Sequence, residues 1–136
     1  MYKKIFFLLV GIFLIVGFTI SSKTYKDCEQ FRNGKFMYHL DPPNNDIIFI
    51  IERKDSIQIE TEPRSGKYSK FSLKWVEPCI YEVKLLETTF NFPDSIQQIR
   101  KTIPFRTKIL SGTSDYYIYQ GSRGEYNTMD TMWVLK

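Results

Sequence analysis

The stretch Lys70-Phe71-Ser72-Leu73-Lys74-Trp75 places an aromatic or aliphatic side chain at every second position, with lysine or serine between them. After Glu77-Pro78-Cys79, the alternation resumes in Tyr81-Glu82-Val83-Lys84-Leu85. Successive side chains of a β-strand point to opposite faces, so a period of two predicts a strand with one apolar and one solvated face. Proline between two such runs marks a break in the chain. This stretch therefore predicts two strands, each with one buried face.

The same period of two recurs on both sides of this stretch. Turn residues such as Asp41-Pro42-Pro43-Asn44-Asn45 separate the runs. Between residues 91 and 101 the pattern changes, and Pro93 followed by Ile96 and Ile99 predicts one short helix. The other predicted strands cover residues 34–40, 47–52, 57–61, 106–111, 116–120 and 129–136.

Many short strands joined by short turns favour an antiparallel meander, which can close on itself without exposed edges. We therefore predict an all-β fold, a small antiparallel up-and-down barrel of about eight strands. The alternative is an open sandwich or half-barrel. The interior of an eight-stranded barrel is filled by side chains or holds one small ligand.

The N-terminal segment has the three parts of a secretory signal peptide. Lys3 and Lys4 precede an uncharged apolar run from Ile5 to Phe18, and Thr19-Ile20-Ser21 offers a small-x-small cleavage site. An uncleaved anchor is the alternative, although residues 5–20 are short for a membrane-spanning helix. We expect export to the periplasm, the cell surface or the medium, with membrane contact only through this segment if it is uncleaved.

The predicted domain organisation is a signal peptide or uncleaved anchor in residues 1–21 and a single β-barrel domain in residues 22–136. Residues 22–136 suffice for one modest core and are too few for two. The aromatic content of 16% excludes the disordered and low-complexity classes.

Charge gives little support for nucleic-acid binding. The formal net charge is +4, and Lys3 and Lys4 contribute to it within the N-terminal segment. Lys70-Phe71 and Lys74-Trp75 interleave base and ring as single-strand binding platforms do. Neighbours on a strand point to opposite faces, so these lysines and rings cannot share one surface. We expect no nucleic-acid partner.

The two cysteines, Cys28 and Cys79, are predicted to form a structural disulfide, because an oxidising compartment favours a disulfide over a reactive thiol. On the chain-entropy model, closing a loop of about 50 residues stabilises the fold by about 4 kcal/mol. A zinc site would need further closely spaced ligands, and the chain has one histidine, His39. We predict no metal and no cofactor.

Aromatic side chains on the predicted apolar faces form the candidate binding site. Such side chains line pockets for small apolar or ring-containing ligands, and they also pack cores. Both interpretations stay open. The candidate residues are Phe36, Tyr38, Phe71, Trp75, Tyr81, Tyr117 and Tyr119.

Catalysis finds little support in the sequence. His39 lies near Asp41, which could orient it as a base. Residues two apart on a strand are separated by roughly 7 Å, and Pro42 forces a turn directly afterwards. The sequence lacks a Gly-x-Ser-x-Gly elbow and any third cysteine. We predict a surface histidine and a protein that is not an enzyme.

Two short stretches resemble motifs of the lipocalins. Asn33-Gly34-Lys35-Phe36 is similar to the glycine-x-tryptophan motif of the first lipocalin strand, with Phe36 in place of tryptophan. Ser114-Asp115-Tyr116-Tyr117-Ile118-Tyr119 resembles the threonine-aspartate-tyrosine-x-x-tyrosine motif near a later turn. The resemblance implies a lipocalin-like barrel.

A second resemblance covers most of the chain after the N-terminal segment. The chain resembles short exported bacterial proteins of unknown function, which are often labelled as DNA topoisomerase IV. The residues argue against that label, because no ATP-binding glycine-rich loop is present and the chain is far too short for a topoisomerase subunit. The matching residues are Cys28, Gly34 to Phe36, Lys74-Trp75, Cys79 to Tyr81 and Asp130 to Trp133.

Two functions from different classes follow from these observations. The first is an exported, non-enzymatic barrel that binds a small apolar or aromatic molecule. The alternative is a structural or interaction module of the cell envelope with a solid core. An interior cavity of about 300 Å³ or more would favour binding, whereas a packed interior would leave only surface recognition.

Overall fold

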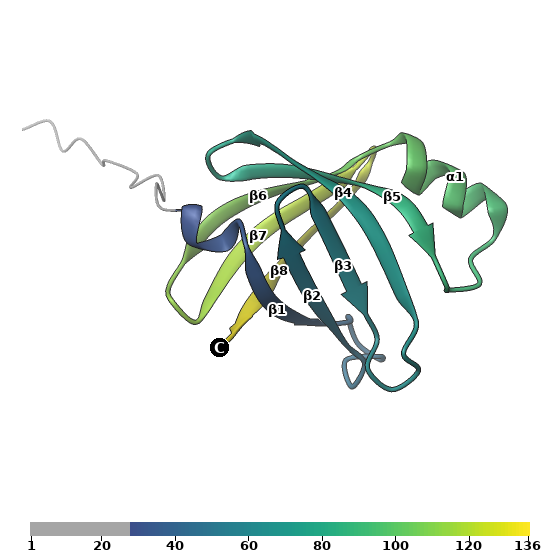
Figure 1. The fold of residues 1–136 in the computed structure, drawn as a ribbon, viewed down its shortest axis with the longest axis horizontal. Coiled ribbons are helices and arrows are strands. Elements are labelled where there is room, and N and C mark those ends of the chain that lie inside the picture. The colour runs from purple at the N-terminus through teal and green to yellow at the C-terminus, as the bar shows by residue number, and fades with distance from the viewer. Residues whose placement is uncertain (1–27) are drawn as a thin grey trace, which may run out of the picture.

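The computed structural model describes residues 28–136, in which eight antiparallel strands close into one barrel (Figure 1). Each strand pairs with its neighbours in sequence, and β8 pairs with β1, which confirms the predicted up-and-down barrel. The signal peptide or anchor predicted for residues 1–21 lies outside the described residues. The elements are the 3₁₀-helix η1 (Glu29–Phe31), β1 (Gly34–His39), β2 (Ile48–Lys54), β3 (Ile57–Thr61), β4 (Tyr68–Glu77), β5 (Ile80–Thr88), α1 (Asp94–Thr102), β6 (Phe105–Gly112), β7 (Tyr116–Arg123) and β8 (Tyr126–Leu135).

The hairpin of β4 and β5 has the predicted faces. Phe71 and Leu73 point inward and are buried, and their cross-strand partners Leu85 and Val83 are buried with them. Lys74, between the inward positions, is exposed. The period of two in this part of the sequence therefore identifies the inner and the outer face of the barrel correctly.

The inner face of β3 is polar. Gln58 is buried opposite Arg53 of β2, and Glu60 stands opposite the buried Ile51. Ile59 lies on the outer side, opposite Glu52. The register of this hairpin therefore carries a line of polar side chains into the barrel, because pairing residues share a face.

The hairpin of β7 and β8 is longer than predicted. Arg123 still pairs with Tyr126, so the turn is confined to Gly124 and Glu125, and Gly124 has a φ of 56° that favours glycine. Further along β7, a Cβ atom on Gly121 would collide with the ring of Phe105. Gly121 thus provides the space in which this ring lies inside the barrel.

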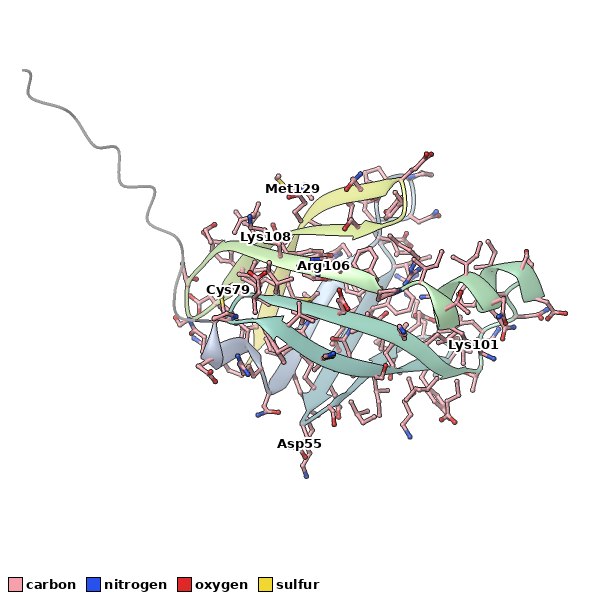
Figure 2. The ribbon with its side chains drawn as sticks, turned by 90° about the horizontal axis from the view of Figure 1, so that it is seen from above. Asp55, Cys79, Lys101, Arg106, Lys108 and Met129 are labelled. Carbon is pink, nitrogen blue, oxygen red and sulfur yellow. A yellow bond between two sulfur atoms is a disulfide. The ribbon has the colours of Figure 1, made fainter. Side chains whose placement is uncertain are left out.

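The two ends of the barrel are covered differently. Figure 1 places η1 at one end and α1, in the connection between β5 and β6, at the other. Figure 2 shows the same separation, with Cys79 near η1 and Lys101 on α1. Cys28 and Cys79 form the predicted disulfide with a Cα–Cα distance of 5.3 Å, which ties η1 to the β4–β5 turn. Phe31 of η1 is buried and closes this end of the barrel.

Candidate ligand-binding site

The closed end of the barrel is built around the buried guanidinium of Arg53. Its Nε donates a hydrogen bond to Gln58 Oε1 at 2.7 Å, and its Nη1 donates to the carbonyl of Phe31 at 3.1 Å. Its Nη2 donates to the hydroxyls of Tyr81 at 2.5 Å and Tyr117 at 2.8 Å. Burying an unpaired cation costs several kcal/mol, so these bonds make the burial of Arg53 tolerable. This end is filled by side chains.

Ring contacts complete the surroundings of Arg53. Its guanidinium carbon lies 4.4 Å from the ring centroid of Tyr81 and 4.6 Å from that of Phe36, distances at which a cation is attracted to the ring face. Burial alone would lower the pKa of Arg53, but the facing Tyr117 and Tyr81 outweigh it and raise that pKa. Arg53 therefore stays protonated.

Gln58 links this closed end to a carboxylate nearer the mouth. While its Oε1 accepts from Arg53, its Nε2 donates to Glu60 Oε1 at 2.8 Å. The Tyr38 hydroxyl faces the other oxygen, Glu60 Oε2, at 3.4 Å. Burial raises the pKa of Glu60, and the hydrogen bond from Gln58 and the charge of Arg100 oppose that rise. We call Arg53, Gln58 and Glu60 the polar chain.

Next to Gln58 and Glu60 of the polar chain, the barrel contains a partly open cavity of ≈ 260 Å³, which we call the inner cavity. Four of the predicted site residues line it: Tyr38, Phe71, Tyr81 and Tyr119. Its wall also contains polar side chains, among them Thr107, so this inner cavity is not a purely apolar pocket. Its volume falls slightly below the roughly 300 Å³ at which ordinary ligand pockets begin.

The other three predicted site residues lie elsewhere. Phe36 and Tyr117 are buried at the closed end, with ring centroids 6.0 Å apart. Trp75 packs against Tyr81 at 4.9 Å, and the guanidinium of Arg32 covers its ring. These three side chains form part of the core and its border rather than the wall of the inner cavity.

A larger groove of ≈ 740 Å³ lies between the mouth of the barrel and α1. One side is a continuous row of four rings from β1, β2 and the β5–α1 connection, which we call the aromatic wall. Its neighbouring centroids are 5.3, 5.8 and 5.6 Å apart. Ile96 and Ile99 of α1 also line the groove and remain 42% and 43% exposed. The aromatic wall consists of Tyr38, Phe49, Phe90 and Phe92.

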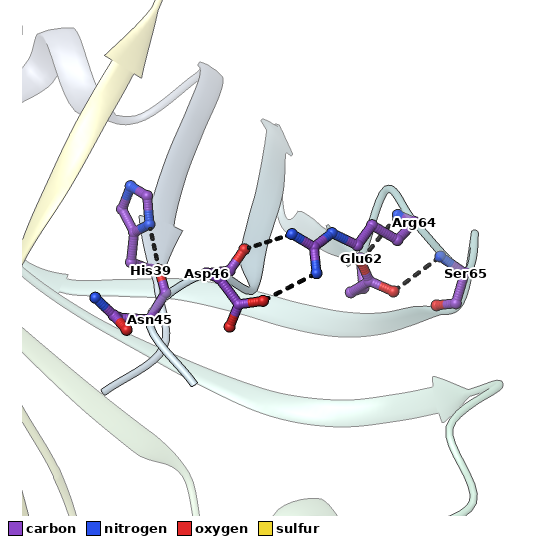
Figure 3. Close-up of polar contacts among 6 residues, drawn as sticks. All are labelled: His39, Asn45, Asp46, Glu62, Arg64 and Ser65. Carbon is purple, nitrogen blue, oxygen red and sulfur yellow. Dashed lines mark hydrogen bonds and ion pairs between the residues drawn. The ribbon is translucent and has the colours of Figure 1, made fainter. Parts of the chain in front are cut away.

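The outer rim of the groove is held by polar contacts between two connections (Figure 3). Arg64 of the β3–β4 turn forms an ion pair with Asp46 of the β1–β2 loop, with 3.1 Å between Nη1 and Oδ2. Glu62 accepts hydrogen bonds from the backbone amides of Arg64 and Ser65, both at 2.8 Å. The charge of Arg64 is thereby engaged within the protein.

Two other arginines stand where the groove meets the inner cavity. Arg100 of α1 and Arg123 of β7 line both spaces, as do Glu60, Tyr38 and Leu40. Burial and the like charge of Arg100 lower the pKa of Arg123. This junction therefore has two cations in proximity to one partly buried carboxylate.

The hydroxyls of Tyr38, Tyr117 and Tyr119 stay protonated at physiological pH. Burial raises the pKa of Tyr38 well above its usual value, and the charge of Glu60 raises it further. Burial likewise raises the pKa of Tyr117 and of Tyr119. These hydroxyls act as hydrogen-bonding groups rather than as bases.

His39 is exposed, as predicted, and its Nδ1 donates a hydrogen bond to the carbonyl of Asn45 at 3.0 Å (Figure 3). Within residues 28–136, no three His, Cys, Asp or Glu side chains are grouped so that they could hold a metal ion. No helix in the same part of the chain is long and apolar enough to cross a membrane.

Sequence patterns did not identify the groove. Phe49 lies in a run that is apolar on both faces, so alternation could not assign it. Phe90 and Phe92 are two residues apart but out of phase with the inward positions from Tyr81 to Leu85, because a register shift between Lys70 and Phe71 interrupts the alternation. Arg100 is four residues after Ile96, a spacing that places both on one helix face.

The fold and the groove together define a small antiparallel β-barrel with a filled closed end and an open mouth beneath a short helix. No protein-family model, no curated protein and no solved structure matches the chain, so the two motif resemblances stay predictions.

Proposed function

We propose that this protein is an exported, non-enzymatic binding protein whose groove holds a small molecule with an apolar body. The observation that carries the proposal is a groove of ≈ 740 Å³ that is lined by the aromatic wall and by the exposed Ile96 and Ile99. Ligand pockets generally have volumes of about 300–1,000 Å³ and walls that are mostly apolar.

Burial of apolar surface supplies the free energy of binding. Fully burying an isoleucine side chain contributes about 1.5–3 kcal/mol. Since Ile96 and Ile99 are 42% and 43% exposed, a ligand that covers them gains about 1 kcal/mol of binding free energy from each. The rings of the aromatic wall are only partly buried, so they add to this gain.

Export enters the proposal through the N-terminal segment and the disulfide. The bond between Cys28 and Cys79 is consistent with an oxidising compartment outside the cytoplasm. The closed end contributes rigidity rather than a site, because Arg53 and Tyr117 fill it.

Titration with the neutral fluorescent probe N-phenyl-1-naphthylamine tests the proposal. Ile96→Ser combined with Ile99→Ser should raise the Kd about 30-fold, since a loss of about 2 kcal/mol corresponds to that factor. Leu86→Ser, which removes an exposed aliphatic side chain of β5 outside the groove, is the matched control and should leave the Kd unchanged. Absence of probe binding to the wild-type protein, or equal loss in the control, would contradict the proposal.

Native mass spectrometry of the protein purified from its own host gives an independent test. A mass increment that is retained by the wild-type protein and lost in the double isoleucine variant would support a groove ligand. A clean apo mass together with silent probe titrations would count against it.

The alternative function, an interaction module, is favoured by a row of side chains outside the barrel. Tyr116 pairs with Trp133, Trp133 with Met37, and Met37 with Ile50, so four apolar residues on four strands form one outward-facing row. Trp133 is 43% exposed. If this row is the functional surface, Trp133→Ser should abolish in-cell cross-linking to envelope components while the groove variants have no effect.

A further inference from the structure

Two guanidinium groups meet at the junction of the groove and the inner cavity, one from α1 and one from β7. We propose that Arg100 and Arg123 bind the anionic head group of an amphipathic ligand, whose apolar body covers the aromatic wall. This inference rests on the proposed function and specifies the class of ligand.

Arg100 is held in place by rings rather than by hydrogen bonds. Its guanidinium carbon lies 4.8 Å from the ring centroid of Phe92 and 5.5 Å from that of Phe71. Among residues 28–136 the side chain of Arg100 forms no hydrogen bond and no ion pair. A guanidinium has five N–H donors in a planar fork, and stacking on a ring leaves its edge available. Arg100 can therefore offer two parallel donors to an oxyanion.

Arg123 is oriented in a similar way. Its guanidinium carbon lies 5.4 Å from the ring centroid of Phe105, and its Nε donates to the carbonyl of Ile103 at 3.2 Å. That hydrogen bond uses one of its five donors, so its two terminal nitrogens remain for a ligand. The backbone carbonyl and the ring fix the direction of the side chain before any ligand binds, which lowers the entropic cost of binding.

The charges around the junction favour an anion. Four basic and two acidic side chains line the groove, and the ion pair with Asp46 already engages Arg64. Among the described residues, no ion pair joins Glu60 to either junction arginine. Asp41 and Asp130 line the inner cavity but not the groove, so the positive side of the junction faces the groove.

The like charges of Arg100 and Arg123 repel each other in the free protein, which is one reason why the pKa of Arg123 is lowered. An oxyanion between them removes that repulsion. Carboxylates and phosphate monoesters share the required chemistry, since both accept the two-pronged donation of a guanidinium. An apolar chain attached to such a head would extend from the junction along the aromatic wall and Ile96.

The experiment compares ligands of equal chain length that differ only in their heads. Decanoate, decyl phosphate and the neutral 1-decanol each compete with N-phenyl-1-naphthylamine on the intact disulfide-bonded protein, at concentrations below micelle formation. We expect at least one acid to bind tenfold or more tightly than decanol, and added NaCl to weaken the acid alone. The acid with the lower Kd assigns the head as a carboxylate or as a phosphate.

Variants test whether the two arginines cause the preference for the acid. Arg100→Gln combined with Arg123→Gln should abolish the preference for the acid, so that the ratio of the Kd values for decanol and the acid falls to about one. Lys101→Gln is the matched control, because Lys101 is exposed on the same helix and does not line the groove (Figure 2). Equal affinities of wild-type protein for acid and alcohol would overturn this inference and leave the proposed function intact. Failure of the probe itself to bind would instead remove the proposed function.

Discussion

Replacing Arg53 tests whether the closed end of the barrel depends on a guanidinium. In Arg53→Met, the Gln58 oxygen and the Phe31 carbonyl lose their donors, whereas the hydroxyls of Tyr81 and Tyr117 still face each other at 3.2 Å. The orphaned Gln58 oxygen costs about 1–3 kcal/mol, and the Phe31 carbonyl loses a hydrogen bond from a charged group, which is worth about 1.5–3 kcal/mol. Because methionine carries no charge, the variant avoids the cost of burying a guanidinium, and this offsets part of the loss. We expect a net loss of about 2–4 kcal/mol in the free energy of unfolding.

Arg53→Lys separates charge from geometry. Lysine keeps the positive charge but replaces the planar fork with a compact, strongly hydrated ammonium. It cannot donate simultaneously to Gln58 on one side and to Tyr81 and Tyr117 on the other in the observed arrangement. We therefore expect Arg53→Lys to be at least as destabilising as Arg53→Met.

Urea unfolding of the oxidised protein, followed by tryptophan fluorescence, measures both effects. Lys54→Met is the control, because Lys54 is the next residue of β2 and is exposed on the outer face. Substitutions at such surface positions usually change stability by less than about 0.5 kcal/mol. The reasoning is refuted if Arg53→Met unfolds at the same urea concentration as Lys54→Met, or if Arg53→Lys keeps the wild-type stability.

Three further predictions concern stability. Cys28→Ser with Cys79→Ser should cost about 4 kcal/mol, because the bond closes a loop between residues 51 apart; equal urea midpoints would contradict this. Gly121→Ala should cost about 1–3 kcal/mol because the added Cβ atom displaces the ring of Phe105, and an unchanged melting temperature would contradict this. Burial raises the pKa of Glu60, so its proton is held more tightly in the folded state. Wild-type stability relative to Glu60→Gln should then fall as pH rises from 4.5 through the raised pKa, and a pH-independent difference in melting temperature would refute this.

The architecture was predictable because short runs of alternating or β-branched residues, separated by turn residues, recur along the chain. Between Phe71 and Leu73 of β4 and between Tyr81 and Leu85 of β5, buried apolar residues alternate with polar or charged ones, so the pattern assigns both strand and face. The helix was predictable from Pro93 and from the spacing of Ile96 and Ile99. In the structure it spans Asp94–Thr102.

The polar interior was not predictable from alternation. In β3, isoleucines alternate with Gln58 and Glu60, and the pattern by itself favours burial of the isoleucines. Burial of Gln58 becomes favourable only when Arg53 faces it across the hairpin, and Arg53 in turn requires Tyr81 and Tyr117 from distant strands. Such a cluster depends on contacts up to 64 residues apart, so a local pattern does not contain it.

The disulfide could be predicted by counting cysteines, whereas the groove is assembled from segments that lie far apart in the sequence. Phe49 comes from β2, Phe90 and Phe92 from the β5–α1 connection, and Arg123 from the end of β7. None of these side chains is unusual in its own sequence context. They become a candidate site only because barrel closure brings the strand ends to one mouth.

The mouth of the barrel stays open because helix α1 lies beside it without packing into it. A helix of nine residues is too short to be stable in water by itself, and none of its residues is buried. Asp94 in its first turn and Arg100 and Lys101 in its last turn match the helix dipole, which contributes only a few tenths of a kcal/mol to about 1 kcal/mol each. Its amphipathic face is directed at the groove, where Ile96 and Ile99 meet no packed partner layer. A ligand that covers this face supplies the apolar burial that the barrel does not provide, so binding must stabilise the helix as well as the complex.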